Sequence, residues 1–163
     1  MAASPVLDAA HSAFIQQGLS ITLGARDDAC RATLVRVVGC AVSPDRREVR
    51  LLFSARQGRE VIERIGRNGA VAVVFSEPSS HRTIQLKAGD ARVVPAEPAD
   101  AELARRHADA FVAHLGALGY GESFVRNLLH VAPEDLVAVV FTPAAAFAQT
   151  PGPGAGGRLA TAS

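Results

Sequence analysis

The chain has 163 residues, of which 48% are hydrophobic, so most of it can form a folded core and is not intrinsically disordered. Its 17 basic and 16 acidic residues leave a formal net charge of +1, which argues against a broad basic surface for nucleic acid. This balance leaves room for a small, local anion site.

The cysteines and the N-terminus indicate the compartment. Cys30 and Cys40 match neither a CxxC redox pair nor a zinc ligand pair, so we expect reduced thiols. The first residues lack the basic start and the unbroken apolar run of a secretory signal. No stretch approaches the ~18 apolar residues of a membrane helix. We therefore expect a cytoplasmic protein with no membrane partner.

The first half of the chain predicts one helix, three strands and a second helix. The segment from Ser4 to Gly18 is amphipathic at helical spacing, with Ser4 as the expected cap and Gly18 as the end. Strand patterns follow, and a helical pattern comes after the last of them. The predicted strands are 19–25 (LSITLGA), 31–42 (RATLVRVVGCAV) and 48–54 (EVRLLFS), and the helix is 59–67 (REVIERIGR).

The second half returns to strands. The run 70–75 (AVAVVF) is continuously apolar, which predicts a strand buried on both faces. Alternation predicts another strand over 81–87 (HRTIQLK), which residues 91–94 can continue. Later come helical patterns at 95–119 and 122–130 and one or two strands within 134–149.

The order of these segments predicts the architecture. Six or seven strands follow one another in hairpin-like succession, without the long βαβ alternation of a doubly wound parallel sheet. We therefore predict a mainly β (α+β) fold, an antiparallel barrel with short peripheral helices. One domain would span residues 1–150, and residues 151–163, which have little to bury, would form a flexible tail.

A strand ends and a helix begins within residues 53–61 (FSARQGREV). Ser54, Arg56 and Arg59 therefore cluster near a helix N-terminus, where free N–H groups and the helix dipole favour an anion. Two guanidinium groups add donors suited to phosphate oxygens. The alternative is a solvated helix start with two surface arginines, and these residues alone leave both interpretations open.

The strand 81–87 is the second candidate. Alternation places one set of polar side chains on a single face, namely His81, Thr83, Gln85 and Lys87. They offer donors, acceptors and a positive charge, and Arg82 could reach a ligand near the strand's edge. The face is either an ordinary solvated surface or the wall of a site for a polar, anionic ligand.

Other patterns give no support for metal or hydrolytic chemistry. His107 and His114 lie on one predicted helix but lack a third ligand, so we expect no metal site. The sequence contains no P-loop, dinucleotide fingerprint or nucleophile elbow.

The order of segments in 53–94 resembles the pyridoxamine 5′-phosphate oxidase-like, FMN-binding split-barrel family. In that family a strand end with a hydroxyl residue and a basic pair precedes a short helix. A buried strand follows, and then a strand of the form Arg-Gln-Val-x-Val-x-Gly. The resemblance covers roughly residues 10 to 150. It implies an antiparallel six- to seven-stranded split β-barrel.

The resemblance also implies roles for the first cluster. Ser54 would lie near the flavin or its phosphate, and Arg59 would bind the phosphate with assistance from Arg56. The upstream family motif Arg-x-Val-Leu-Leu-Lys has a loose counterpart in residues 31–37 (RATLVRV). Either Arg31 or Arg36 could contribute from it.

For the second cluster, Arg82 and Thr83 match the Arg-Gln pair that opens the later family strand. Thr83 replaces the usual Gln, and Gln85 on the same face can take over its hydrogen bonding. With Lys87, this face resembles a flavin-facing wall.

The leading functional hypothesis is an FMN-dependent oxidoreductase acting on a small molecule. We do not expect a true pyridoxamine phosphate oxidase, because those enzymes carry a C-terminal tryptophan and this chain has none. A deazaflavin could replace FMN. The second hypothesis is a non-catalytic carrier or sensor that holds flavin or haem, with His81 as the first residue to inspect. The third is a barrel without a cofactor.

The resemblance finally implies a homodimer, because family members hold FMN in a groove between two protomers. The segment 147–151 (FAQTP) would then reach the flavin bound mainly by the partner.

Overall fold

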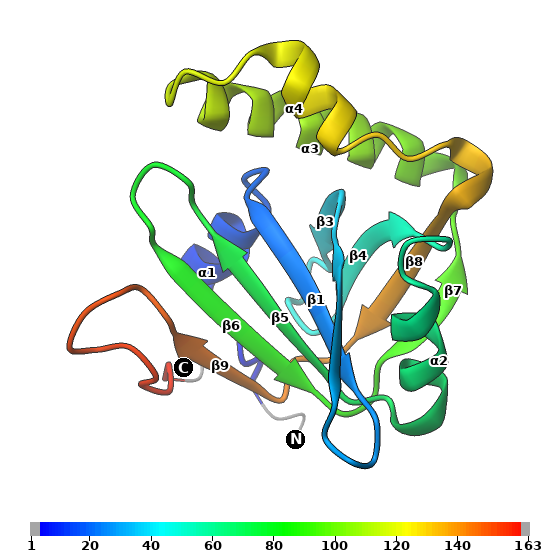
Figure 1. Cartoon of the computed structure of the whole chain (residues 1–163). Helices are drawn as coiled ribbons and strands as arrows, with labels where there is room; N and C mark the ends of the chain where they lie inside the picture. Colours follow the sequence, from blue (N-terminus) through cyan, green and yellow to red (C-terminus); the bar gives the residue numbers. More distant parts are fainter. Residues whose placement is uncertain (1–3, 161–163) are drawn as a thin grey trace.

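The computed structural model describes residues 4–160 and contains two antiparallel sheets (Figure 1). The larger sheet consists, in spatial order, of β2 (Ala32–Arg36), β1 (Ser20–Arg26), β5 (Val71–Ser76), β6 (Thr83–Ala88) and β9 (Ala145–Ala148). The smaller sheet consists of β3 (Gly39–Val42), β4 (Val49–Ser54), β8 (Leu136–Phe141) and β7 (Arg92–Pro95).

The helices lie at the periphery of these sheets. They are α1 (Ala9–Ile15), α2 (Arg59–Asn68), α3 (Pro98–Gly116) and α4 (Glu122–Leu128), with a 3₁₀ turn, η1, at Pro133–Asp135. In Figure 1, α3 and α4 lie side by side across one end of the sheets, and α2 stands at the β2 side of the larger sheet. Within residues 4–160, none of the helices has both the length and the apolar character needed to cross a membrane.

The core lies between the two sheets. Alternate residues of β1 and β5 point inward and are buried, for example Leu23 and Val73, which are fully buried and face each other in register. Each such side chain contributes about 1.5–3 kcal/mol relative to exposure. Helix α2 adds Val61 and Ile65 to this core. A smaller cluster, which includes Phe111 and Val125, lies under α3 and α4.

The predicted α+β split-barrel architecture is confirmed, but the described chain has nine strands rather than six or seven. The reason is that two predicted strands cross from one sheet to the other. Within 31–42 the crossing falls at two consecutive residues. The Val37 N–H donates to Ile21 O of the larger sheet (3.0 Å), and the Val38 N–H donates to Leu52 O of the smaller sheet (2.7 Å). Likewise, 81–94 divides into β6 and β7.

Two local predictions were wrong. Strand β5 is not buried on both faces, because Ala72, Val74 and Ser76 point away from the core and stay partly exposed. Helix α1 is not capped by Ser4. It begins at Ala9, and the Asp8 carboxylate caps it by accepting a hydrogen bond from the His11 N–H (2.6 Å).

The predicted tail is exposed, yet part of it follows strand β9. Three backbone hydrogen bonds join residues 156–159 to this strand, and Leu159 packs against the core. The bonds are Gly156 N–H to Ala148 O (2.7 Å), Ala148 N–H to Gly157 O (2.8 Å) and Leu159 N–H to Ala146 O (2.8 Å). Residues 161–163 of the predicted tail lie outside the described residues.

Candidate functional site

The candidate site is the outer face of the larger sheet, which points away from the core. Because side chains alternate along a strand, every second residue points outward, and the strand register aligns these residues in rows about 7 Å apart. Row one contains Leu34, Gly24, Ala72, Lys87 and Ala145. Row two contains Arg36, Thr22, Val74, Gln85 and Phe147, and row three contains Ser20, Ser76, Thr83 and Gln149.

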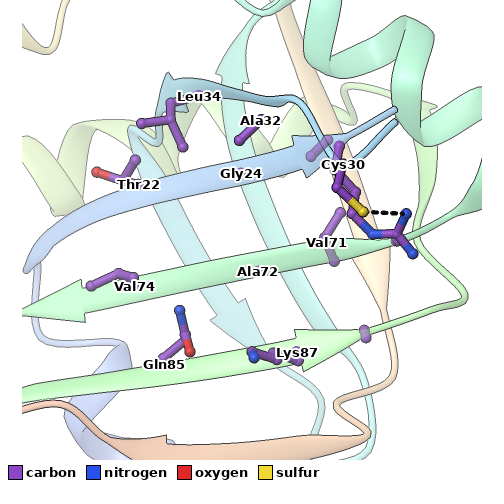
Figure 2. Close-up of a pocket in the computed structure, with 14 residues that line it drawn as sticks. Thr22, Gly24, Cys30, Ala32, Leu34, Val71, Ala72, Val74, Gln85 and Lys87 are labelled. Atoms are coloured by element: carbon purple, nitrogen blue, oxygen red, sulfur yellow. Dashed lines mark hydrogen bonds between the residues drawn. The ribbon is translucent and has the colours of Figure 1, made fainter. Parts of the chain in front are cut away.

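Rows one and two hold a groove of about 470 Å³, which we call the lower groove (Figure 2). Its floor is hollow because Gly24 and Ala72, which face each other on β1 and β5, carry almost no side chain. A Cβ atom at Gly24 would come within 3.1 Å of Leu34 Cδ2. The walls are the larger side chains of Leu34, Val74 and Gln85. This size is typical of small-molecule sites.

The charge of the lower groove is positive. Arg26 and Lys87 line it, and no carboxylate does among the residues that the structure describes. The Arg26 guanidinium donates to the Asp27 carbonyl oxygen (3.3 Å) and lies 3.9 Å from the Sγ atom of Cys30. The Lys87 ammonium lies 5.0 Å from the centre of the Phe147 ring. These two cations give the groove a region suited to an anion.

Row three and Arg36 form the floor of a second groove of about 530 Å³, which we call the upper groove. Its opposite wall comes from α3, α4 and the turn between them. There the rings of Tyr120 and Phe124 stack at 5.8 Å between centroids, with an angle of 21° between their planes. Leu118 and Leu128 extend this apolar wall.

The two grooves contain every large hydrophobic side chain that is exposed within residues 4–160. Leu34, 65% exposed, lines the lower groove. The others line the upper groove, namely Leu118 (49%), Tyr120 (51%), Phe124 (56%) and Leu128 (40%). Such clustering is typical of a surface that a ligand or another protein covers.

The structure brings part of the second predicted cluster into the grooves. Gln85 and Lys87 line the lower groove, and His81 and Thr83 line the upper one. The Thr83 hydroxyl is already engaged, since it lies 2.8 Å from the Ser76 hydroxyl and donates to His81 O (2.9 Å).

Arg82 lies apart from this cluster. Its guanidinium carbon sits 4.0 Å from the centre of the Phe14 ring, and Arg82 lines neither groove.

The first predicted cluster lies elsewhere. Ser54 is buried, and its hydroxyl donates to the Asp135 carboxylate while accepting from the Gln57 N–H (3.1 Å). The other Asp135 carboxylate oxygen accepts from the Arg56 N–H (2.8 Å). These bonds lower the pKa of Asp135, the Ser54 hydroxyl most of all. Ser54 thus ties the end of β4 to the start of β8.

Ser54, Arg56 and Arg59 line neither groove. The two predicted clusters lie apart in this fold, because β4 belongs to the smaller sheet and β6 to the larger one. The structure also separates the two upstream candidates. Arg31 pairs with the Asp27 carboxylate (2.8 Å), whereas Arg36 lines the upper groove.

Sequence reasoning missed most of the residues that line the grooves, and four of them are informative. Thr22 and Arg26 lie on β1 two positions either side of Gly24, so simple alternation along this strand predicts that all three share its outer face. Tyr120 and Phe124 are four residues apart on a short helix and the turn before it, and their exposed apolar pairing was the available signal.

No known protein-family profile matches the chain, and no curated protein matches it either. Solved structures do resemble it. HupZ from Group A Streptococcus has a TM-score of 0.54 at 11% identity, covering 92% of this chain and 100% of that one. A proposed pyridoxamine 5′-phosphate oxidase from Lactobacillus delbrueckii has a TM-score of 0.53 at 16% identity, with coverages of 86% and 93%.

A third similar structure, an F420 reductase, has a TM-score of 0.52 at 14% identity and covers 86% of this chain and 98% of that one. At these identities the comparisons establish the fold. The chain has the split-barrel fold of the pyridoxamine 5′-phosphate oxidase-like proteins, as the order of its sequence segments predicts.

Proposed function

We propose that the protein binds a flavin, FMN, in the lower groove and acts as an oxidoreductase on a small molecule. The observation that carries this proposal is the groove itself: a hollow apolar floor beside two cations, Arg26 and Lys87, with no carboxylate among its described lining. FMN is a flat ring system joined to a phosphate, so it needs both features.

The residues present fit this cofactor. Gly24 and Ala72 let a flat ring approach the sheet closely, and Gln85 offers an amide to its polar edge. Lys87 and Arg26 would hold the phosphate. When bound, the flavin supplies the redox chemistry, while the protein supplies binding, orientation and exclusion of water.

The proposal includes a homodimer in which a second copy covers Leu34, the exposed apolar side chain on the outer face of the larger sheet. Arg56 and Arg59 line neither groove of their own protomer. In this proposal they bind the phosphate of a flavin held between the two copies. Ser54 positions Arg56 through Asp135, which accepts from the Arg56 N–H, and Arg82 positions the start of β6 through Phe14.

Two alternative cofactors have specific support. The fold similarity to an F420 reductase supports a deazaflavin in the same groove. His81, which lines the upper groove, supports haem held by a non-catalytic carrier or sensor.

The test is a visible spectrum of the purified protein, followed by mass spectrometry of the ligand released on denaturation. Flavin absorbance and the mass of FMN support the proposal. A deazaflavin mass or a Soret band would replace it with one of the alternatives.

A protein purified without ligand is titrated with FMN. Ala72→Leu, which fills the groove floor, should abolish binding, whereas Ala113→Leu on the exposed surface of α3 should not. Failure of the unaltered chain to bind FMN would overturn the proposal.

A further inference from the structure

The two grooves adjoin along the same strands. Each of three strands contributes one outward residue to the lower groove and the next outward residue to the upper groove. The pairs are Thr22 and Ser20 on β1, Val74 and Ser76 on β5, and Gln85 and Thr83 on β6. Outward residues along one strand are about 7 Å apart. A molecule in the upper groove would therefore lie edge to edge with one in the lower groove.

The wall of the upper groove is suited to an aromatic ring. Tyr120 and Phe124 are about half exposed, and their stacked rings line this groove. Leu118 and Leu128 flank them on the same wall. A flat apolar molecule inserted here would contact aromatic faces on one side and the sheet on the other.

The floor of the upper groove offers a cation with no partner. No hydrogen bond or ion pair joins the Arg36 side chain to another residue within the part of the chain that the structure describes. The hydroxyls of Ser76 and Thr83 are bonded to each other. The one carboxylate in the described lining, that of Glu77, accepts from the Ser80 hydroxyl. A guanidinium in this state is suited to binding a carboxylate through two parallel hydrogen bonds.

We propose that the upper groove binds the organic substrate and that this substrate is an aromatic carboxylate. Arg36 binds its carboxylate, and Tyr120 and Phe124 bind its ring. This inference rests on the proposed function, because the substrate role requires a flavin in the lower groove.

The protein offers a direct readout of this site. Tyr120 is the only tyrosine and the chain has no tryptophan, so the intrinsic emission of the whole protein reports on the upper groove. The probes are 2-naphthoate and its neutral analogue 2-naphthamide, titrated into the FMN-loaded protein. Calorimetry gives the affinities, and quenching of the tyrosine emission locates the probe. Flavin absorbance measures FMN binding independently.

Arg36→Gln is expected to weaken 2-naphthoate binding at least about 10-fold and to change 2-naphthamide binding less than about twofold, because only the acid uses the charge. Phe124→Ala should weaken both probes. Arg106→Gln, which removes an exposed charge on α3 outside the grooves, should change neither.

Three outcomes overturn the inference. The first is FMN binding without 2-naphthoate binding, which leaves the flavin proposal standing. The second is an equal loss of acid and amide affinity in Arg36→Gln. The third is dissociation of a dimer by Phe124→Ala with no probe binding, which makes a second copy the occupant of the groove. If FMN itself does not bind, the flavin proposal falls and the substrate role falls with it.

Discussion

The Lys87 ammonium lies 5.0 Å from the centre of the Phe147 ring, so that a charge on β6 is held over an aromatic face on the neighbouring strand β9. At an exposed site this contact contributes about 0.5–1 kcal/mol. It keeps the cation at the edge of the lower groove. Lys87 is the only lysine in the chain, so amine-directed reagents address this position and the N-terminus alone.

We predict that Lys87→Gln weakens FMN binding by about 1.5–3 kcal/mol, the range for a hydrogen bond to a charged group, and leaves the melting temperature nearly unchanged. Lys87→Arg should retain most of the affinity. Titration of flavin fluorescence measures the FMN affinity of both variants. Arg106→Gln removes the same charge outside the grooves, and an equal loss there would show that the effect is only one of net charge. FMN should also protect Lys87 from an amine-reactive label.

A separate prediction concerns Arg59. If it binds the phosphate between two copies, Arg59→Ala should weaken FMN binding by ~1.5–3 kcal/mol. The control on the same helix is Arg67→Ala, because Arg67 is 59% exposed and pairs with the nearby Glu63. Arg64 is unsuitable, since its guanidinium donates to the Arg31 carbonyl oxygen. Equal effects of Arg59→Ala and Arg67→Ala would remove Arg59 from the site.

The tail gives a prediction about stability. Deleting residues 152–163 removes three backbone hydrogen bonds to β9, and each contributes about 0.5–1.5 kcal/mol net. We expect the shortened chain to fold but to lose roughly 1.5–4.5 kcal/mol of unfolding free energy in urea. Deleting only residues 161–163 is the control. An unchanged midpoint in the longer deletion would mean that these bonds do not persist in solution.

The sequence predicts the positions of the helices and strands better than it predicts which strands belong to which sheet. Alternation along 81–87 correctly predicted a strand and placed Gln85 and Lys87 on one outward face. Local pattern does not show that a strand leaves one sheet and joins another, because Val37 and Val38 look alike in sequence. Only their different partners, Ile21 and Leu52, reveal the crossing.

Local pattern also does not show which distant segments pack together, and this explains why the sequence predicts only part of the candidate site. Ser54 was correctly placed at the end of a strand and Arg59 at the start of the following helix, but no local signal tells that α2 packs away from the outer face of β6. The upper groove depends on a contact between distant segments, since Tyr120 lies far along the chain from Thr83. Such contacts follow from tertiary packing and not from periodicity.

The exposed outer face of the larger sheet leads to a prediction about dimer formation. Leu34 is 65% exposed beside the hollow floor of the lower groove, where a second copy would bury it. Leu34→Glu should therefore shift a dimer toward monomer, as measured by light scattering after size exclusion at micromolar protein. Leu34→Met, which keeps the side chain apolar, is the control. A monomer that still binds one FMN per chain would contradict the shared site.

The last prediction concerns pH and His107 of α3. This imidazole is 6% exposed, and its Nε2 atom has no hydrogen-bond partner within the described residues. Burial, helped by the nearby His114, lowers the pKa of His107 to about 4 from its ordinary value of 6.5. The unfolded chain therefore binds a proton at a higher pH than the folded chain does. Folding stability is fully present above about pH 6.5 and falls as the pH drops toward 4, by roughly 3 kcal/mol in all.

Unfolding in urea at pH values between about 5 and 6.5 isolates most of this effect, because carboxylates with lowered pKa values, such as Asp135 and Glu102, contribute mainly nearer the unfolded values of about 3.9 for Asp and 4.3 for Glu. His107→Leu removes the unpaired nitrogen and should flatten the dependence of unfolding free energy on pH across this window. His130→Gln, a substitution at an exposed histidine, should leave the slope intact. A slope that survives in His107→Leu would show that another group titrates on unfolding. It would also mean that His107 can accept a proton without leaving its place beside Phe111.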